Sequence, residues 1–348
     1  MTTSTGPDLV RFCLVGGGRA GRVHAATLTR HLSGAAITAV VDADEGVRQA
    51  AEADFAPGHG YATIADALED GGFDAVVITT PTFTHAELAV QAAKGGKHVF
   101  LEKPMALSLA ECDAIIAACE EAGVRLQIGF MRRFDPEFRA AFERIEGGEI
   151  GQPMVVKSLT HGPGLPPPWA RDLAKSNGML AEVNSHDLDC VRWLMGSDPI
   201  RVMSETANFK GKARGVDDPD FYDTVLTQLR FDNGGLGSVS GICPCDYGYD
   251  ARVEIVGEKG IMQIGDMRGQ AIVACTDRDG GLRTPIYRTW PQRFAWGYIE
   301  EMRHFVDCIR EGRDPEPSGA DGRWAVALVL AGRRSIAEDR SVTIAEVM

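Results

Sequence analysis

The sequence predicts an α/β protein with two domains: a doubly wound parallel sheet in the N-terminal third, then an α+β domain with a large, mainly antiparallel sheet. The chain has 348 residues, more than a single hydrophobic core usually serves. Its first third alternates short apolar runs with helical segments, as parallel sheets covered on both faces do. Beyond residue 130, alternating strand patterns and glycine-rich turns take over. We therefore expect one domain over residues 8–130 and a second over residues 131–348.

The apolar runs of the first domain are expected to form its parallel strands. They are Val10–Val15, Ile37–Val41, Ala75–Thr79, His98–Leu101 and Leu126–Phe130. The segments between them, such as His85–Ala93 and Ala110–Cys119, carry apolar residues three and four positions apart, which is helical spacing. Strands joined by helices in right-handed βαβ order predict a Rossmann-type sheet of five or six strands.

The second domain shows a different pattern. Thr224–Phe231 and Arg252–Val256 alternate apolar and polar residues, as strands with one buried face do. Asn233-Gly234-Gly235 is typical of a tight turn between antiparallel strands. The proline-rich stretch Pro163–Pro168 is expected to be a loop. These features predict an α+β arrangement.

The charge and composition of the chain exclude several classes of protein. The formal net charge is −13 and no basic run occurs, which argues against a nucleic-acid partner. No apolar stretch reaches the roughly 20 residues that a membrane span needs. No signal peptide is visible, and we expect a cytoplasmic protein. The acidic balance fits a neutral or cationic small substrate.

The eight cysteines are scattered and form no CxxC pair, which favours reduced thiols. The closest pair is Cys243-Pro244-Cys245. A metal site would need two further ligands at matching spacing, and the sequence offers none. We therefore expect no metal.

A glycine turn follows the first apolar run directly, in the order Gly16-Gly17-Gly18-Arg19-Ala20-Gly21. In a dinucleotide-binding turn, the position of Gly16 allows the sharp bend and that of Gly18 lets the backbone approach a pyrophosphate. The position of Gly21 allows close packing of helix on strand. The N–H groups at the start of the following helix would then face the anion. This G-x-G-x-x-G pattern predicts a dinucleotide site, although a glycine turn alone can be purely structural.

The second apolar run ends in Asp42, where the ribose of a bound adenosine would lie. Its carboxylate can accept both ribose hydroxyl hydrogen bonds and would repel a 2′-phosphate. The sequence therefore favours NAD over NADP as the cofactor. Arg48 is a reservation, because it could reach the same pocket from the next helix.

Two further stretches identify a family. Thr79-Thr80-Pro81-Thr82 precedes His85, and Glu102-Lys103-Pro104 ends the fifth predicted strand. Together with the glycine turn, these stretches resemble the Gfo/Idh/MocA oxidoreductases over the whole N-terminal half. The resemblance implies that Lys103 points at the substrate beside the nicotinamide, where its ammonium can stabilise a developing alkoxide. Lys97 and His98 are expected to be structural. The candidate cofactor contacts are Gly16, Gly18, Arg19, Ala20, Asp42, Thr80, Pro81, His85, Glu102 and Lys103.

Glu182 and His186 are candidate catalytic residues of the second domain. A spacing of four residues would put them on one face of a helix, and a histidine beside a carboxylate suits a general base. The pair resembles the family's D-x-x-x-H motif, in which the histidine is the base. Glu replaces the usual Asp here, which puts the role of Glu182 in doubt. An ordinary helix-face salt bridge is the alternative.

Within the family, two stretches look like inositol 2-dehydrogenases: Gln127–Asp135, and Tyr247–Asp250 with the Glu254–Gly260 segment behind it. The resemblance implies that Tyr247 or Tyr249 approaches the substrate, and which of them does so stays open. Both could instead fill a sheet face. The segment from His161 to Lys175 departs from inositol dehydrogenases and could shape the pocket or contact another subunit.

We therefore expect NAD-dependent oxidation of a secondary ring hydroxyl of an inositol-like cyclitol to a ketone. Candidate substrate contacts are Lys103, Glu182, His186, Tyr247 and Tyr249. Alternatives are a dehydrogenase of a sugar or amino-sugar ring, including aminocyclitol antibiotic assembly, an NAD-dependent glycosidase, and a cofactor-sensing regulator. The resemblance implies a homo-oligomer, dimer or tetramer, formed through the open sheet of the second domain.

Overall fold

The computed structural model describes residues 9–56, 59–216, 218, 220–269, 274–275 and 282–348. The chain divides into two compact units. The first consists of Met1–Phe134 with Trp296–Val326, and the second of Asp135–Ala295 with Ala327–Met348.

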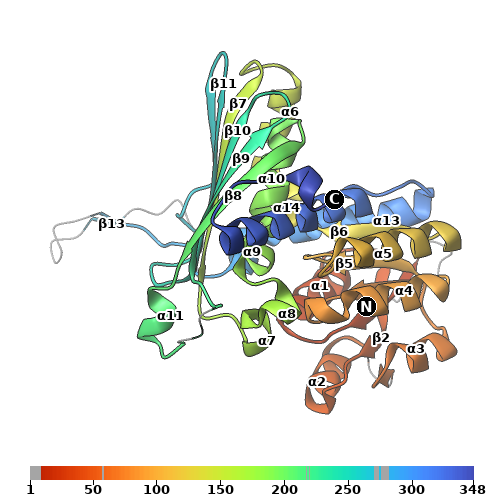
Figure 1. Ribbon diagram of the computed structural model, residues 1–348. Coiled ribbons are helices and arrows are strands. Elements are labelled where there is room, and N and C mark those ends of the chain that lie inside the picture. The colour runs from red at the N-terminus through yellow and green to blue at the C-terminus, as the bar shows by residue number, and fades with distance from the viewer. Residues whose placement is uncertain (1–8, 57–58, 217, 219, 270–273, 276–281) are drawn as a thin grey trace. The chain divides into compact units, whose positions relative to one another are not determined.

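The first unit contains a six-stranded parallel sheet in the order β3-β2-β1-β4-β5-β6 (Figure 1). The predicted Rossmann sheet is confirmed, and its five apolar runs lie within two residues of the observed strands. The one strand without a sequence signal is the two-residue β3, which is too short to show any period. The strands are β1 (Val10–Val15), β2 (Ala35–Val41), β3 (Gly60–Tyr61), β4 (Ala75–Ile78), β5 (His98–Glu102) and β6 (Leu126–Gly129).

Helices connect these strands, and side-chain caps fix where several of them begin. Ser108 and Glu111 form a reciprocal capping box, and Asp44 and Thr63 each accept a backbone N–H of the first turn. Gly123 ends one helix in the left-handed conformation. The helices and 3₁₀ turns are α1 (Arg19–Arg30), α2 (Glu45–Phe55), α3 (Ile64–Asp70), η1 (Thr82–Thr84), α4 (His85–Lys94), α5 (Leu109–Ala122) and η2 (Met131–Phe134).

A helix from late in the chain completes the core of the first unit. Helix α13 (Ala295–Glu311) packs against the parallel sheet, where Phe305 contacts the rings of Phe12 and Phe100 at centroid distances of 6.2 and 5.8 Å. Met302 and Phe305 are fully buried in the same cluster. Burying such side chains contributes roughly 1.5–3 kcal/mol each. The segment after α13 continues into α14 (Gly319–Glu338), whose first residues also belong to this unit.

The second unit contains a seven-stranded sheet in the order β12-β11-β7-β10-β9-β8-β15. Only β7 and β10 pair in parallel, so the predicted mainly antiparallel sheet is confirmed. A separate two-stranded pair joins β13 (Ala274–Cys275) to β14 (Leu282–Arg283). The strands of the large sheet are β7 (Pro153–Pro163), β8 (Pro199–Ala207), β9 (Thr224–Phe231), β10 (Leu236–Cys245), β11 (Asp250–Gly257), β12 (Ile261–Ile264) and β15 (Val342–Thr343).

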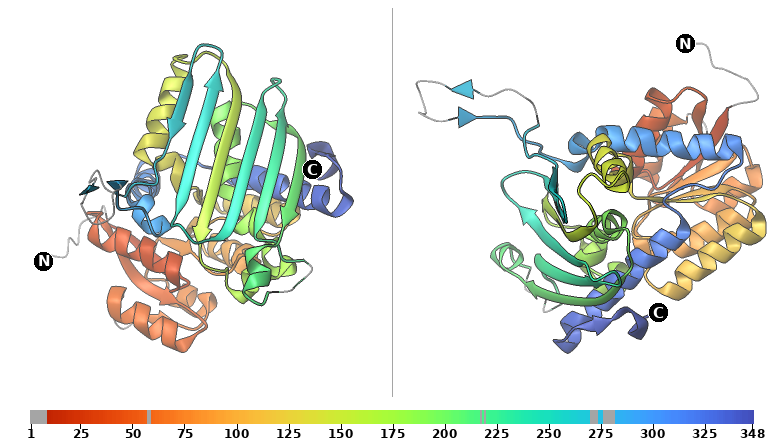
Figure 2. Two further views of the ribbon diagram at one scale, coloured as in Figure 1. Left: turned by 90° about the vertical axis from the view of Figure 1, so that its left-hand side faces the viewer. Right: turned by 90° about the horizontal axis from the view of Figure 1, so that it is seen from above.

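Helices of the second unit lie on one side of this sheet (Figure 1). Helix α10 (Ser185–Met195) packs on β7 and β10, and α6 (Pro136–Glu146) packs near β12. The left view of Figure 2 shows the opposite face, on which Leu226, Leu236 and Ile261 are exposed. The short helices are α7 (Pro168–Arg171), α8 (Leu173–Ser176), α9 (Met179–Glu182), α11 (Lys210–Ala213), α12 (Trp290–Arg293) and η3 (Ile344–Glu346).

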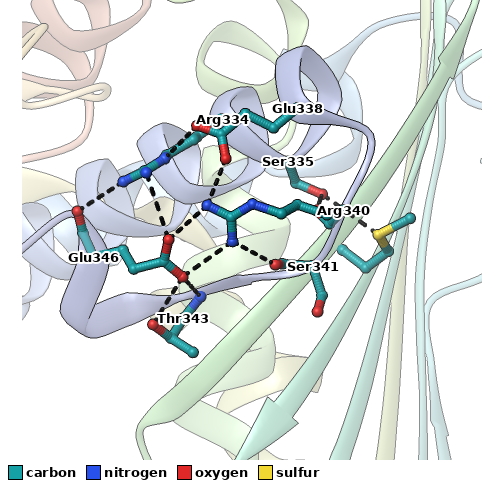
Figure 3. Close-up of polar contacts among 8 residues, drawn as sticks. Arg334, Ser335, Glu338, Arg340, Ser341, Thr343 and Glu346 are labelled. Carbon is teal, nitrogen blue, oxygen red and sulfur yellow. Dashed lines mark hydrogen bonds and ion pairs between the residues drawn. The ribbon is translucent and has the colours of Figure 1, made fainter.

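A network of ion pairs fixes the C-terminal segment at the β8 edge of the sheet (Figure 3). Arg340 pairs with Glu338 and Glu346, and Arg334 pairs with the same two carboxylates. Glu346 also accepts the N–H of Thr343 in a capping box, and these donors lower the pKa of Glu346 to about 2. The network holds β15 against β8, which covers an otherwise open sheet edge.

In the described part of the chain, no helix is long and apolar enough to cross a membrane. Seven cysteines are free and buried there, and the side chain of Cys275 lies outside the described residues. Cys243 and Cys245 are not a bonded pair, because each Sγ donates to a backbone carbonyl, of Gly164 and Gly248 respectively.

Candidate functional site

The glycine turn has the geometry that a pyrophosphate requires. Gly16 adopts a φ of +100°, and a Cβ there would come within 3.0 Å of the Thr79 and Thr80 backbone. A Cβ at Gly21 would lie 2.0 Å from the Gly16 carbonyl oxygen, so only glycine permits this approach. A Cβ at Gly18 would meet nothing within 4 Å, so this side of the turn is open to a ligand. Gly18 supplies no side-chain cap to α1, leaving the first-turn N–H groups directed at that space.

Asp42 lies at the end of β2, where the sequence predicted the ribose-binding carboxylate. Its Oδ2 accepts the N–H of Gly17 at 2.8 Å and its Oδ1 accepts the N–H of Asp44 at 2.9 Å. Each oxygen keeps a second lone pair, so the carboxylate can still accept ribose hydroxyls. Arg48 donates to the Asp42 carbonyl oxygen at 2.7 Å, so its guanidinium does lie beside this position. The carboxylate and the open glycine turn together fit a bound NAD.

His85 joins the two family-specific stretches. Its Nε2 lies 2.8 Å from the Thr80 carbonyl oxygen and its Nδ1 lies 2.8 Å from that of Pro104. The ring is buried, which lowers the pKa of His85. With both nitrogens facing backbone carbonyls, His85 shapes the site through Thr80 and Pro104. Of the other candidate cofactor contacts, Arg19 is exposed, while Ala20 and Pro81 are partly exposed.

Glu102 is the last residue of β5, and Lys103 follows it directly. The Glu102 carboxylate is buried: Oε1 lies 2.7 Å from His24 Nε2, and Oε2 accepts the N–H of Lys103 at 3.0 Å. His24 and Lys103 lower the pKa of Glu102, although burial opposes them. The Lys103 side chain itself is partly exposed, whereas the sequence suggested a buried ammonium. The sequence reasoning missed His24, because no residue spacing relates it to Glu102.

The predicted single helix carrying Glu182 and His186 is wrong. Glu182 ends α9 and His186 lies in α10, with Val183 and Asn184 as a turn between them. The Asn184 N–H bonds to the Met179 carbonyl five residues back, which interrupts the regular ladder. Spacing alone therefore does not put the two side chains on one helical face. His186 is almost fully buried, and Glu182 is partly exposed.

A buried carboxylate next to His186 anchors α10 to the sheet. Asp187 accepts hydrogen bonds from Ser158 at 2.5 Å, Thr160 at 2.6 Å and Asn184 at 2.9 Å. Ser158 and Thr160 lie on β7, so the start of α10 is fixed to that strand. Hydrogen bonds to a buried charge are among the stronger ones. This anchor fixes the backbone that carries His186, and the sequence reasoning did not identify it.

The two candidate tyrosines have different surroundings. Tyr249 is buried and packs edge-on against Phe294, at a centroid distance of 6.2 Å. Tyr247 is exposed, and its hydroxyl contacts His161 Nδ1 and, at 3.4 Å, Asp250 Oδ2. Burial and the neighbouring Asp250 raise the pKa of Tyr247 to about 12, so the phenol keeps its proton at neutral pH. Of the two, Tyr247 is the one with its hydroxyl in a polar setting.

The segment from His161 to Lys175 is more regular than expected. His161 and Pro163 belong to β7, Pro168 begins α7 and Lys175 lies in α8, so only residues 164–167 are outside helix and strand. Burial lowers the pKa of His161, while Asp250 acts in the opposite direction. His161 contacts Tyr247 and Ser240, a cluster that the sequence gave no reason to expect.

Among the described residues, no three His, Cys, Asp or Glu side chains gather in a way that could hold a metal ion.

Comparison with known proteins assigns both parts of the chain. Residues 10–130 match the oxidoreductase family with the NAD-binding Rossmann fold, and residues 143–344 match the C-terminal alpha/beta domain of the same family. The scyllo-inositol 2-dehydrogenase (NAD(+)) of Bacillus subtilis is 34% identical over 94% of this chain and 94% of its own. The inositol 2-dehydrogenase of Rhizobium meliloti is 36% identical over 97% and 99%.

A solved structure extends the comparison. GenD2 from gentamicin A biosynthesis, in complex with NAD, is 27% identical and superposes with a TM-score of 0.86 over 96% of each chain. The matches cover the glycine turn, the Glu102-Lys103-Pro104 stretch and the sheet of the second unit. The chain therefore belongs to the Gfo/Idh/MocA oxidoreductase family and is an NAD-dependent dehydrogenase that acts on CH–OH groups.

Proposed function

We propose that this dehydrogenase oxidises a secondary ring hydroxyl of an inositol-like cyclitol to a ketone. The observation that carries this proposal is the full-length similarity to inositol 2-dehydrogenases of two organisms, at 34% and 36% identity. The exposed hydroxyl of Tyr247 and the partly exposed Lys103 and Glu182 are groups that could bind a polyhydroxylated ring.

In the proposed mechanism, His186 removes the hydroxyl proton and Lys103 stabilises the alkoxide as it develops. NAD, when bound, accepts the hydride from the ring carbon. Gly16 and Gly18 give the backbone approach that its pyrophosphate needs, and Asp42 accepts its ribose hydroxyls. Glu182 orients His186, Lys103 or both. The contribution of these residues is orientation and charge stabilisation.

A substrate panel read by NADH absorbance tests the proposal. We expect myo- or scyllo-inositol to be oxidised with a higher kcat/KM than hexoses or amino sugars. A preference for hexoses would contradict the cyclitol assignment. NADH formation in proportion to product would also exclude an NAD-dependent glycosidase, which restores its cofactor in each cycle, and a cofactor sensor, which turns nothing over.

Oxidation of an aminocyclitol or amino-sugar ring is a second candidate. Two observations favour it: the similarity to GenD2 of gentamicin A biosynthesis, and the proline-rich segment from His161 to Lys175, which departs from inositol dehydrogenases. Aminoglycoside intermediates in the same panel decide between the two. A higher kcat/KM for an aminated ring than for any inositol would favour this second candidate.

We also propose that the chain forms a homo-oligomer, a dimer or tetramer, in the cytoplasm. The exposed Leu226, Leu236 and Ile261 on the open sheet face support a subunit contact there. Light scattering of the purified protein should give a mass of two or four chains, and a monomer at working concentration would contradict it. The seven buried free thiols fit a reducing compartment.

The preference for NAD over NADP should depend on the charge of Asp42. Replacing Asp42 with Asn keeps the size of the side chain and removes the charge that would repel a 2′-phosphate. We expect the ratio of kcat/KM with NADP to that with NAD to rise about 10- to 100-fold, since a charge pair near a surface amounts to about 1–4 kcal/mol. Arg48, beside Asp42, could then attract the phosphate.

Asp44→Ala is the matched control, because Asp44 carries the same charge two residues away and only caps α2. An unchanged cofactor ratio in Asp42→Asn, or an equal rise in both variants, would contradict the role of Asp42.

A further inference from the structure

Three titratable side chains that the mechanism does not use lie buried in the first unit. His24 is on α1, Glu102 ends β5 and Glu301 is on α13, with exposed fractions of 0%, 7% and 0%. Tyr298, one turn before Glu301, packs edge-on against the His24 ring at a centroid distance of 5.3 Å. Phe100 of β5 contacts the same ring at 4.9 Å. The three groups therefore share one region between α1, the sheet and α13.

His24 holds the Glu102 carboxylate from one side. The separation of His24 Nε2 and Glu102 Oε1 is 2.7 Å, and an ionised carboxylate can only accept, so Nε2 carries the proton. The second oxygen accepts the N–H of Lys103 at 3.0 Å. Both oxygens of Glu102 are thus fixed, one to the helix that starts at the glycine turn and the other to the backbone of Lys103.

Glu301 is in a different state. Neither of its carboxyl oxygens has a hydrogen-bond partner among the described residues, although the side chain is fully buried. Burial, and after it the charge of Glu102, raise the pKa of Glu301 well above its usual value. Gln127 on β6 donates to the main-chain oxygen of Glu301 at 3.1 Å and brings no charge. An ionised Glu301 here would be an unpaired buried anion, which is costly.

We propose that His24 is a positioning residue for the reaction at Lys103, and that Glu301 is kept protonated so that only Glu102 in this cluster carries a negative charge. This inference rests on the proposed function. The groups that face the cluster are His24 from α1, Glu102 and Lys103 at the end of β5, and Glu301 from α13. Because α1 also begins at the glycine turn, His24 connects the cofactor-binding helix to the strand that ends beside Lys103.

The protonation of Glu301 is tested without any substrate. Infrared spectroscopy of the wild-type protein at neutral pH should show the C=O stretch of a protonated carboxylic acid, and Glu301→Gln should lose it. Glu300→Gln is the matched control, because Glu300 is the exposed neighbour on the same helix and pairs with Arg303. The proposal is overturned if the band is absent from the wild-type protein or persists in Glu301→Gln.

The pH dependence of stability gives a second test of Glu301. A carboxyl whose pKa is raised on folding adds stability that is complete below its unfolded pKa and is lost as the pH rises toward its folded pKa. Glu301→Gln cannot ionise in either state, so it escapes this loss. Its Tm should gain on the wild-type Tm by about 3 °C or more between about pH 5 and about pH 8. A constant difference across this range would contradict the assignment.

Substitutions of His24 test its positioning role. His24→Gln can place an N–H donor where Nε2 lies, whereas His24→Leu cannot donate at all. We expect His24→Leu to lower kcat about 10- to 100-fold, as small displacements at a reacting centre do, and His24→Gln to restore most of the loss. The control is His98→Leu, which removes a histidine from the other end of β5, where Nδ1 accepts the N–H of Arg125. It should lower Tm without the loss in kcat.

The outcomes separate the two proposals. A wild-type enzyme that oxidises no ring alcohol would refute the proposed function, while the infrared band and the pH series would still decide the state of Glu301. An active enzyme in which His24→Leu, His24→Gln and His98→Leu lower kcat equally would refute the positioning role of His24. The Gln variant also keeps the test decisive if His24→Leu does not fold.

Discussion

Replacing His186 with Ala should lower kcat by about 10²- to 10⁴-fold, the usual contribution of a general base. In the proposed mechanism no other group takes the hydroxyl proton. His186 lies at the start of α10, and Asp187 fixes that backbone to Ser158 and Thr160 of β7. NAD binding, measured by titration calorimetry, should be retained, because the candidate cofactor residues are in the first unit.

The pH profile provides a sharper test of the same residue. A histidine base must be neutral, so kcat/KM of the wild-type enzyme should fall as the medium becomes acidic, and this limb should be absent from the variant. Cys190→Ala, one turn further along α10, is the control for a packing defect and should keep the wild-type profile. Retained turnover in His186→Ala, or the same acid limb in both proteins, would assign the proton transfer to another group.

Replacing Lys103 with Met should lower kcat by about 10²- to 10³-fold, as the loss of one group that stabilises a developing oxyanion does. Met keeps most of the aliphatic length and removes the charge. If the ammonium acts on the alkoxide, the loss should fall mainly on kcat and leave NAD affinity within a few-fold. Stopped-flow measurement of NADH formation would separate the chemical step from product release.

Lys97→Met is the matched control for Lys103. Lys97 lies six residues earlier, donates to the Phe73 carbonyl oxygen at 2.8 Å and packs over the Phe73 ring. Its loss should lower Tm and leave turnover intact. Comparable kcat values for the two variants would show that the charge of Lys103 does not assist the reaction.

The sequence was informative where structure and chemistry depend on neighbours along the chain. A glycine at a positive φ, as at Gly16, or in close contact with backbone, as at Gly21, is required by local geometry. Asp42 and Lys103 lie at strand ends, and strand ends can be found from apolar runs. These features predicted the Rossmann sheet and the NAD site without knowledge of the tertiary contacts.

The same reasoning failed where a regular period was assumed. The spacing of Glu182 and His186 matches a helix, but the turn at Val183 and Asn184 divides it into two. Asn184 uses its side chain to bind Asp187 and its N–H to reach Met179, so tertiary contacts took precedence over the helical ladder. The proline-rich segment after His161 likewise formed two short helices where a loop was expected.

The sequence by itself determined the fold class, the cofactor and the family of this protein, because these depend on short motifs and on periodic burial. Only the tertiary structure placed His24, Glu102 and Glu301 in one buried region and separated the exposed Tyr247 from the buried Tyr249. Whether a side chain is buried, and which group it meets, depends on strand register and helix packing between distant segments. Those contacts set the charge state of a buried carboxyl, and no spacing along the chain encodes them.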